Sequence, residues 1–474
     1  MVFSSILFLL YFLPIFLILY QLTGKNYKNY FILFASVLFY AWGAPKFVFL
    51  LLISTIIDFY LVNAMHRTRE AIQKKILLGL SIGLNVGLLL YFKYANFFID
   101  NVNTILANSG INTISWTKIV LPIGISFYTF QTLTYSIDVY RKAHVPLKKL
   151  TNYLLYIMSF PQMIAGPIVR FKEIADQIEE RKETTDDKLQ GIIRFSIGLA
   201  KKVLIANVMG EQADIILSQN PESISSSYLW LGMIAYTFQI YFDFSGYSDM
   251  AIGLGRIMGF SFPENFNHPY TSKSISEFWR RWHITLGVWM RDYLYIPLGG
   301  NRVSTKFRLY SNLWFVFLIS GFWHGASWNF LIWGAYHGVF LILDRLFLDK
   351  LLTKVPSLFR VLFTFGLVVI GWVFFRLENF DQAILVIHQM FNFSNFTSDF
   401  NMIPTFNIVF ISAILFSFIH LSKFGKEACD WVFFYKTSKM KWYLIMLPIA
   451  FTLFGLSLAR ISAQGFNPFI YFRF

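Results

Sequence analysis

The chain has little cysteine and little charge for its length. Of its 474 residues, one is cysteine and only 14% are Asp, Glu, Lys or Arg. A single cysteine, Cys429, excludes an intramolecular disulfide and a cysteine-rich metal site. Soluble domains carry about 25% charged residues, so this composition argues against a soluble protein.

Apolar and aromatic residues take the place of charge. Hydrophobic residues make up 56% of the chain, Phe alone numbers 55, and the mean hydropathy is +0.53. The net charge of +15 would suggest nucleic acid in a soluble protein. Here the basic residues lie in short loops between apolar runs, so we expect lipid and not nucleic acid as their partner.

Apolar runs long enough to cross a bilayer recur from end to end. They predict an all-α, polytopic membrane protein with about 11–13 transmembrane helices, some broken or re-entrant, around a central tunnel. The predicted spans lie near residues 3–22, 29–43, 46–64, 76–95, 117–137, 190–210, 227–245, 310–331, 335–349, 358–376, 404–421 and 442–460. Pro161, Gly166 and Pro167 predict that residues 151–169 form a broken segment.

The charges of the loops predict how the chain is oriented in the membrane. With these spans, the basic loops at 25–28, 67–75, 141–149, 302–308 and 423–441 fall on one side, and the Lys/Arg-free loops at 97–116, 211–226 and 379–403 on the other. Because basic loops stay in the cytoplasm, both termini are expected to be extracytoplasmic. The mixed charges of residues 170–188 predict a cytoplasmic amphipathic segment. With no linker in sight, residues 1–474 are expected to form one domain.

Between residues 236 and 338 polar and aromatic side chains interleave densely. This region holds four motifs, which are Tyr241–Asp249, Phe278–Thr285, Arg291–Arg302 and Trp323–Gly338. So many polar groups are costly against lipid and suit the lining of a wet cavity or tunnel. We expect the catalytic region here.

His324 stands in an apolar segment of this region. A charge at a helix centre costs roughly 2.5–3.5 kcal/mol, so an ionisable group there indicates function. Imidazole is also the side chain that best moves protons near neutral pH. The sequence therefore predicts a membrane-embedded enzyme. The structural alternative is a core histidine that donates to a neighbouring carbonyl.

These motifs, with the terminal Asn467–Phe474, resemble the membrane-bound O-acyltransferase (MBOAT) family, in particular its bacterial alginate O-acetyltransferase-like branch. The resemblance extends from Leu121–Ser126 to the last residue. It implies a ring of helices around a thinned centre in the bacterial inner membrane. It also implies acyl transfer from a cytoplasmic thioester to a hydroxyl on the outer side.

In that branch the expected donor is acetyl-CoA, a co-substrate and not a bound cofactor, or an acetyl carrier. The acceptor belongs to a cell-envelope polysaccharide or exopolysaccharide. The acetyl group reaches it directly or through a partner, either an SGNH-esterase-type acetyltransferase outside the membrane or other polysaccharide machinery. The runner-up is transfer of D-alanine from a carrier-protein thioester to teichoic acid.

Two histidines match family positions. His324 matches the active-site histidine and acts as general base or as acyl-accepting nucleophile, which the sequence leaves open. His283 orients the acceptor, shuttles the proton or stabilises the oxyanion, or it simply braces a broken segment. Further tunnel-lining candidates are Tyr241, Asp243, Ser245, Arg281, Trp282, Arg291, Asp292, Trp323, Ser327, Trp328 and Asn329.

Each further assignment has an alternative. The charged candidates can simply pair with one another, because buried charges need partners. Arg291 or Arg302 can instead bind coenzyme phosphates. The histidines lack metal-ligand spacing, so no metal is expected. A transporter would show matched broken segments in two halves, which this chain lacks. A non-catalytic scaffold would not need His324 with its surround.

Overall fold

The protein is described by a computed structural model that covers residues 2–394, 401–433, 440–463 and 465–468. These residues form helices, turns and loops and contain no strand, which confirms the all-α class. They form two compact units. Unit 1 covers Met1–Thr184 and Gly255–Phe262, and unit 2 covers Thr185–Leu254 and Pro263–Phe474.

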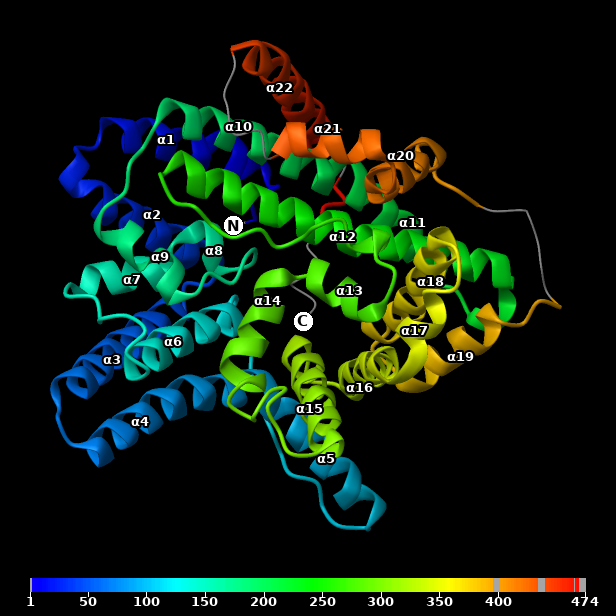
Figure 1. Ribbon diagram of the computed structural model, residues 1–474, viewed down its shortest axis with the longest axis horizontal. Helices are drawn as coiled ribbons and strands as arrows, with labels where there is room; N and C mark the ends of the chain where they lie inside the picture. Colours follow the sequence, from blue (N-terminus) through cyan, green and yellow to red (C-terminus); the bar gives the residue numbers. More distant parts are fainter. Residues whose placement is uncertain (1, 395–400, 434–439, 464, 469–474) are drawn as a thin grey trace. The chain divides into compact units, whose positions relative to one another are not determined.

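Unit 1 contains the first nine α-helices (Figure 1). They are α1 (Leu13–Leu22), α2 (Lys28–Gly43), α3 (Val48–Arg67), α4 (Ala71–Leu89), α5 (Ala95–Asn108), α6 (Ile125–Tyr140), α7 (Leu150–Met158), α8 (Phe160–Met163) and α9 (Phe171–Glu179). The predicted broken segment is present, because α7 ends at Met158 and the short α8 ends at Met163. The segment at 170–188 forms α9 and the start of the next helix.

A buried carboxylate holds four helices of unit 1 together. Asp58 on α3 accepts hydrogen bonds from Ser81 at 2.5 Å and Asn85 at 2.9 Å, both on α4, and from Tyr153 on α7. Ser81 in turn shares a hydrogen bond with Ser136 on α6. Because a polar group at membrane depth needs partners, this cluster ties the helices to one another.

Unit 2 contains the other thirteen α-helices (Figure 1). They are α10 (Thr185–Ala200), α11 (Asn207–Leu217), α12 (Ser226–Ile257, whose last residues belong to unit 1), α13 (Ile275–Arg281), α14 (Ile284–Met290), α15 (Lys306–His324), α16 (Trp328–Leu343), α17 (Asp349–Leu352), α18 (Ser357–Arg376), α19 (Phe380–Met390), α20 (Phe406–Phe418), α21 (Lys423–Phe433) and α22 (Met440–Ala463).

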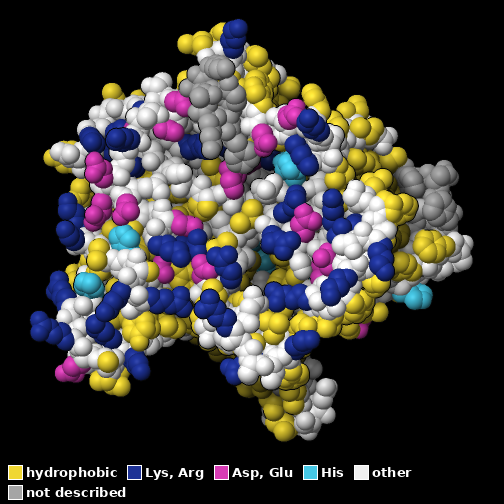
Figure 2. All heavy atoms as spheres, viewed as in Figure 1, with side chains coloured by type: hydrophobic (Ala, Val, Ile, Leu, Met, Phe, Trp, Pro, Cys, Tyr) yellow, Lys and Arg dark blue, Asp and Glu magenta, His cyan; other side chains and the backbone are white. Residues whose placement is uncertain are grey.

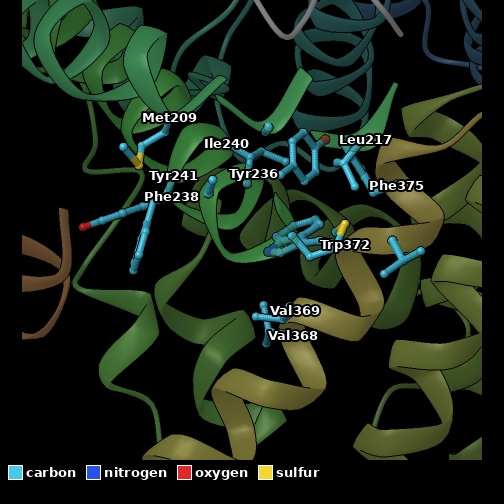
Figure 3. Packing of buried hydrophobic residues seen from close by; sticks show 14 of the residues in the cluster. Met209, Leu217, Tyr236, Phe238, Ile240, Tyr241, Val368, Val369, Trp372 and Phe375 are labelled. Atoms are coloured by element: carbon cyan, nitrogen blue, oxygen red, sulfur yellow. The ribbon is translucent and has the colours of Figure 1, made fainter. Parts of the chain in front are cut away.

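The core of unit 2 lies where α11, α12 and α18 meet. Figure 3 shows Leu217 from α11, Tyr236 and Ile240 from α12, and Val369 and Trp372 from α18 within this core. Trp372 and Val369 are almost completely buried. Large aromatic and branched side chains fill such a core densely and fix the relative positions of the helices that contribute them.

Several helices are suited to a bilayer. Among the described residues, five segments are long and apolar enough to cross it, namely Val48–Arg67, Ala71–Asn108, Trp328–Leu352, Ser357–Arg376 and Met440–Ala463. A sixth is added if α20 and α21, which meet at a bend of 99°, count as one. Other predicted spans correspond to shorter helices such as α2, which has 16 residues. The number of about 11–13 remains a prediction.

Several predicted boundaries are wrong. Helix α5 covers Ala95–Asn108, although 97–116 was expected to be a loop, and α6 begins at Ile125, although a span was expected from residue 117. Residues 310–331 were expected to form a single span, but α15 ends at His324 and α16 begins at Trp328. Helix α15 starts at a cap, because the Thr305 hydroxyl accepts a hydrogen bond from the Arg308 amide at 3.2 Å. The chain turns in Gly325–Ser327, and this break places His324 at a helix end instead of inside a span.

Lys and Arg side chains are numerous on the face shown in Figure 2. Exposed Arg302, Lys306 and Arg308 precede or begin α15. They belong to one of the basic loops that are expected to lie in the cytoplasm. The orientation of the termini remains a prediction.

Candidate active site

His324 is the last residue of α15 and is 6% exposed. The hairpin of α15 and α16 is unusually close, because a Cβ added to Gly321 would overlap the Phe330 carbonyl oxygen and lie 3.0 Å from the Gly334 Cα atom. A side chain on Gly325 would overlap the Phe330 ring. These glycines allow the turn to bring His324 into the interior of unit 2.

Aromatic rings surround His324. Its ring centroid lies 4.8 Å from that of Trp323, 5.1 Å from Trp333 and 5.3 Å from Phe375, all in edge-to-face geometry. Rings packed in this way restrict the rotation of the imidazole and exclude bulk water from it. His324 is therefore held in a narrow range of orientations.

His283 occupies a strained turn between α13 and α14. Its φ of 45° and ψ of 53° lie in the left-handed region, which a non-glycine residue rarely adopts. Two backbone hydrogen bonds hold the turn, since the Ile284 amide donates to the Asn265 carbonyl and the Asn267 amide donates to the Arg281 carbonyl, each at 2.9 Å. Such strain is often found at functional sites.

Asn265 also holds the side chain of His283. Its Oδ1 atom lies 3.0 Å from His283 Nδ1 and accepts a hydrogen bond from the Thr285 hydroxyl at 2.8 Å. His283 is only 1% exposed, and its ring packs edge-to-face on Phe244 at 4.7 Å. The imidazole is thus fixed by both polar and apolar contacts.

The two histidines lie near each other. Their ring centroids are 6.4 Å apart. His283 lies outside the candidate spans, and burial lowers the pKa of its imidazole to about 3. At neutral pH the ring of His283 is therefore uncharged, with one nitrogen protonated and a lone pair on the other.

His283 lines a cavity of about 500 Å³. Ser320, one turn before His324 on α15, lines it as well, together with apolar side chains such as Leu286 and Val316. Three exposed arginines, Arg280, Arg291 and Arg345, contribute to its lining. No acidic residue is among its described lining residues, so the cavity attracts anions. Arg302, the other expected phosphate-binding candidate, is exposed but is not among these lining residues.

Most of the charged candidates form ion pairs. Asp243 lies 2.8 Å from Lys202, and both side chains are 2% exposed. Arg281 pairs with Glu277 at 2.6 Å. Arg291 pairs with its neighbour Asp292 at 2.7 Å while also lining the cavity. These contacts favour structural roles for Asp243 and Arg281.

The remaining candidates lie in different surroundings. Trp282 and Tyr241 pack against each other at 6.2 Å between centroids. Tyr241 and Ser245 also line a second, smaller cavity of about 40 Å³. Ser327 precedes α16, and Trp328 is 57% exposed at its first residue. Asn329 is buried and donates a hydrogen bond to the Leu377 carbonyl at 2.5 Å, so it braces the end of α18.

Several residues of this site were not among the predicted site residues. They are Asn265 and Thr285 beside His283, Trp333 and Phe375 beside His324, and Arg280, Ser320 and Arg345 in the cavity. Asn265 lies in the polar run Asn265–Tyr270, which was a signal for it. Arg345 and Phe375 carry no local signal, because only the tertiary fold brings them to the site.

Among the described residues, no set of three or more His, Cys, Asp or Glu side chains could hold a metal ion. The absence of a metal remains a prediction.

Comparisons with known proteins identify the family of this chain. The model of the MBOAT, membrane-bound O-acyltransferase family, matches residues 47–377. The chain is 42% identical to a probable alginate O-acetylase of Pseudomonas putida, with all of both chains covered. It is 34% identical to a peptidoglycan O-acetyltransferase of Helicobacter pylori, with 100% of this chain and 98% of the relative covered.

A further relative is similar to only part of this chain. The chain is 30% identical to a teichoic acid D-alanyltransferase of Bacillus subtilis, over 53% of this chain and 68% of the relative. The region matched by the family model contains both buried histidines, His283 and His324. This chain is an acyltransferase and a multi-pass protein of the bacterial inner membrane, and it belongs to the membrane-bound O-acyltransferase family.

Proposed function

We propose that this protein transfers an acetyl group from acetyl-CoA in the cytoplasm to a hydroxyl of an extracytoplasmic cell-envelope polysaccharide. One observation carries the proposal. The neutral His283 lies beside His324 and lines a cavity whose lining includes three arginines. Full-length similarity to alginate and peptidoglycan O-acetyltransferases supports acetyl over other acyl groups.

The cavity suits a coenzyme-type donor. Arg280, Arg291 and Arg345 offer guanidinium groups to phosphates, which they bind with charge-assisted hydrogen bonds. Arg345 is already oriented by a hydrogen bond to Asn301 at 3.1 Å. Leu286, Val288 and Leu313 provide apolar contacts for the uncharged arm of the donor. The thioester would then lie beside His283, which lines the same cavity.

The chemistry requires one proton to move. The acceptor hydroxyl loses its proton as its oxygen attacks the thioester carbonyl carbon, the C–S bond breaks, and the sulfur leaves and takes up a proton as free thiol. His324 acts as general base for this attack, or it accepts the acetyl group first as a nucleophile. In either route the aromatic rings around His324 keep competing water away.

The acceptor is reached directly or through a partner. The relatives named above act on alginate and on peptidoglycan, which supports a polysaccharide acceptor or its modification machinery. An SGNH-esterase-type acetyltransferase outside the membrane would be such a partner. D-alanyl transfer from a carrier protein is the second candidate, supported by the partial similarity to teichoic acid D-alanyltransferases.

The test measures free thiol released from acetyl-CoA by purified protein in detergent. Wild type, His324→Ala and His388→Ala are compared with and without membrane-fraction glycan. His388 lies on α19 with its side chain exposed, so its variant controls for loss of an unrelated histidine. We expect release by wild type and His388→Ala and none by His324→Ala.

Two other results would change the account. Release only from a D-alanyl-loaded carrier protein would replace the donor and favour the second candidate. Equal release by wild type and His324→Ala would remove His324 from the mechanism.

A further inference from the structure

Asn265 makes several contacts around His283 that no sequence motif indicated. Its carboxamide is 1% exposed. Its Oδ1 atom lies 3.0 Å from His283 Nδ1 and accepts from the Thr285 hydroxyl at 2.8 Å and the Thr285 amide at 3.3 Å. Its Nδ2 atom donates to the Ser248 hydroxyl on α12 at 3.2 Å.

These contacts determine which atom of the amide faces His283. The Thr285 backbone N–H can only donate, so the amide atom beside it must be the oxygen. The same oxygen lies beside His283 Nδ1, and two acceptors cannot share a hydrogen bond. His283 Nδ1 therefore carries the hydrogen, and in a neutral ring the lone pair is on Nε2.

We propose that Asn265 is a positioning residue that holds His283 in its Nδ1-protonated tautomer, so that Nε2 serves as a proton acceptor in acyl transfer. The acceptor hydroxyl proton passes to Nε2, directly or through His324, and returns to the sulfur of the departing thiol. The ring ends as it began, and no other reactant is needed. The proposal rests on the acyl-transfer function above and assigns a task to its second histidine.

An amide is better suited to this position than a carboxylate. A carboxylate beside Nδ1 would favour the imidazolium and so occupy Nε2 with a proton before the reaction. Titratable groups near the pair include His324 on α15 and Arg280 on α13 near His283, and Asp249 on α12 next to Ser248. Glu264, which precedes Asn265 in the chain, pairs with Arg194 at 2.6 Å, and His268 lines the smaller cavity with Asn265. Asp249 itself pairs with Arg194 at 2.6 Å and Lys201 at 2.7 Å.

The strained backbone supports the same role. The left-handed φ of His283 is held by the Ile284–Asn265 backbone bond, so Asn265 fixes both the main chain and the ring of His283. Strain at one residue persists only where its surroundings determine it strongly. Asn265 supplies a large part of that determination.

The principal test replaces Asn265 by a group of the same shape. In Asn265→Asp the Oδ1 acceptor remains, and the Ser248 hydroxyl can rotate to donate to the second oxygen. The carboxylate raises the pKa of His283, so the acid limb of the plot of log kcat against pH should move to higher pH. KM for the acyl donor should stay within about twofold of wild type, since uniform binding is untouched.

Two companion variants separate positioning from structure. Asn265→Leu removes the acceptor, and kcat should fall by about 10²–10⁴-fold, the usual contribution of a proton-transfer group. Thr285→Val removes a hydrogen bond to the same oxygen and leaves the Asn265–His283 contact. It should keep the wild-type pH profile, whereas a merely structural amide would make the two variants alike.

Specific results would overturn the proposal. These are an Asn265→Asp profile that superimposes on that of wild type, or an Asn265→Leu enzyme that stays folded and keeps its kcat. If the variants do not fold, ¹⁵N-histidine labelling of wild type decides. The histidine signal that is missing from the spectrum of His283→Asn belongs to His283. It should show a hydrogen on Nδ1, and a hydrogen on Nε2 instead would contradict the proposal. If the enzyme does not use acetyl-CoA, only that donor is rejected, because the pH profile can be measured with any thioester that the enzyme uses.

Discussion

The imidazole rings of His283 and His324 lie with their centroids 6.4 Å apart at an angle of 55°. Helix α15 delivers one ring at its last residue, and the strained turn before α14 delivers the other. Both residues belong to unit 2 and both are nearly inaccessible to solvent. The proposed chemistry depends on this pair, on the contacts that position it and on the binding of the acyl donor beside it.

The glycine contact between α15 and α16 should control the position of His324. In Gly321→Ala the new methyl group meets the backbone of Phe330, so the helices must separate at a cost of about 1–3 kcal/mol. Thermal unfolding in detergent should occur a few degrees lower, and acyl transfer should fall. Gly366→Ala on α18, where nothing lies within 4 Å of the new Cβ, is the control. Equal melting temperatures for the two variants would contradict close helix packing.

The buried pair of Lys202 and Asp243 should stabilise the fold without taking part in catalysis. Lys202→Met leaves the Asp243 carboxylate buried without its cation and should destabilise the protein by about 3–5 kcal/mol. Arg360→Met removes an exposed pair with Asp349 and should cost about 1 kcal/mol or less. Thermal unfolding compares the two. A Lys202→Met protein as stable as Arg360→Met would show that the buried pair does not form.

The arginines that line the cavity should govern donor binding. In Arg345→Glu, KM for acetyl-CoA should rise roughly two- to tenfold with kcat nearly unchanged. The effect is modest because the lost guanidinium group is exposed to solvent, where charge interactions are weak. The difference should shrink as KCl is raised, since salt screens exposed charges. Arg308→Glu, exposed and outside the cavity lining, should behave as wild type. The same rise in KM in both variants would reduce the effect to overall surface charge.

The single cysteine allows the orientation to be tested. With Cys429 replaced by serine, Ser109→Cys and Ser304→Cys each introduce one exposed thiol. Ser109 directly follows α5 within the Lys/Arg-free stretch 97–116, and Ser304 lies among basic residues. A membrane-impermeant thiol reagent added to intact cells should label Ser109→Cys alone. Labelling of Ser304→Cys instead would invert the predicted topology, together with the extracytoplasmic termini.

Local sequence patterns predicted the helical membrane fold and singled out His324, whereas His283 was indicated by the family resemblance. Apolar runs and polar residues at membrane depth are local signals, so α3, α18 and α22 lie close to their predicted spans. The break at Gly325–Ser327 was missed, because its three small residues can be part of a span and apolar residues resume after Asn329. The turn is dictated by helix–helix contact at Gly321 and Gly334, which no local pattern reveals.

The candidate site was predicted only in part for the same reason. Asp243 is charged and buried, and its pairing with Lys202 depends on how α12 packs against residues 201–206. Asn265 and His283 are separated in sequence, and their side chains meet because two backbone hydrogen bonds join the segments that carry them. Residue type indicated which groups are chemically capable, but their pairing follows from tertiary packing.

Transfer of labelled acetyl groups in inverted membrane vesicles tests the central claim most directly. Such vesicles expose the cytoplasmic face, so radiolabelled acetyl-CoA added outside reaches only that face, and the label is sought as base-labile ester on glycan inside. Vesicles from a deletion strain that carries wild type or His388→Ala should incorporate label, and those with His324→Ala should not. Equal incorporation with His324→Ala, or incorporation only in vesicles of the opposite orientation, would contradict acetyl transfer across the membrane at this histidine.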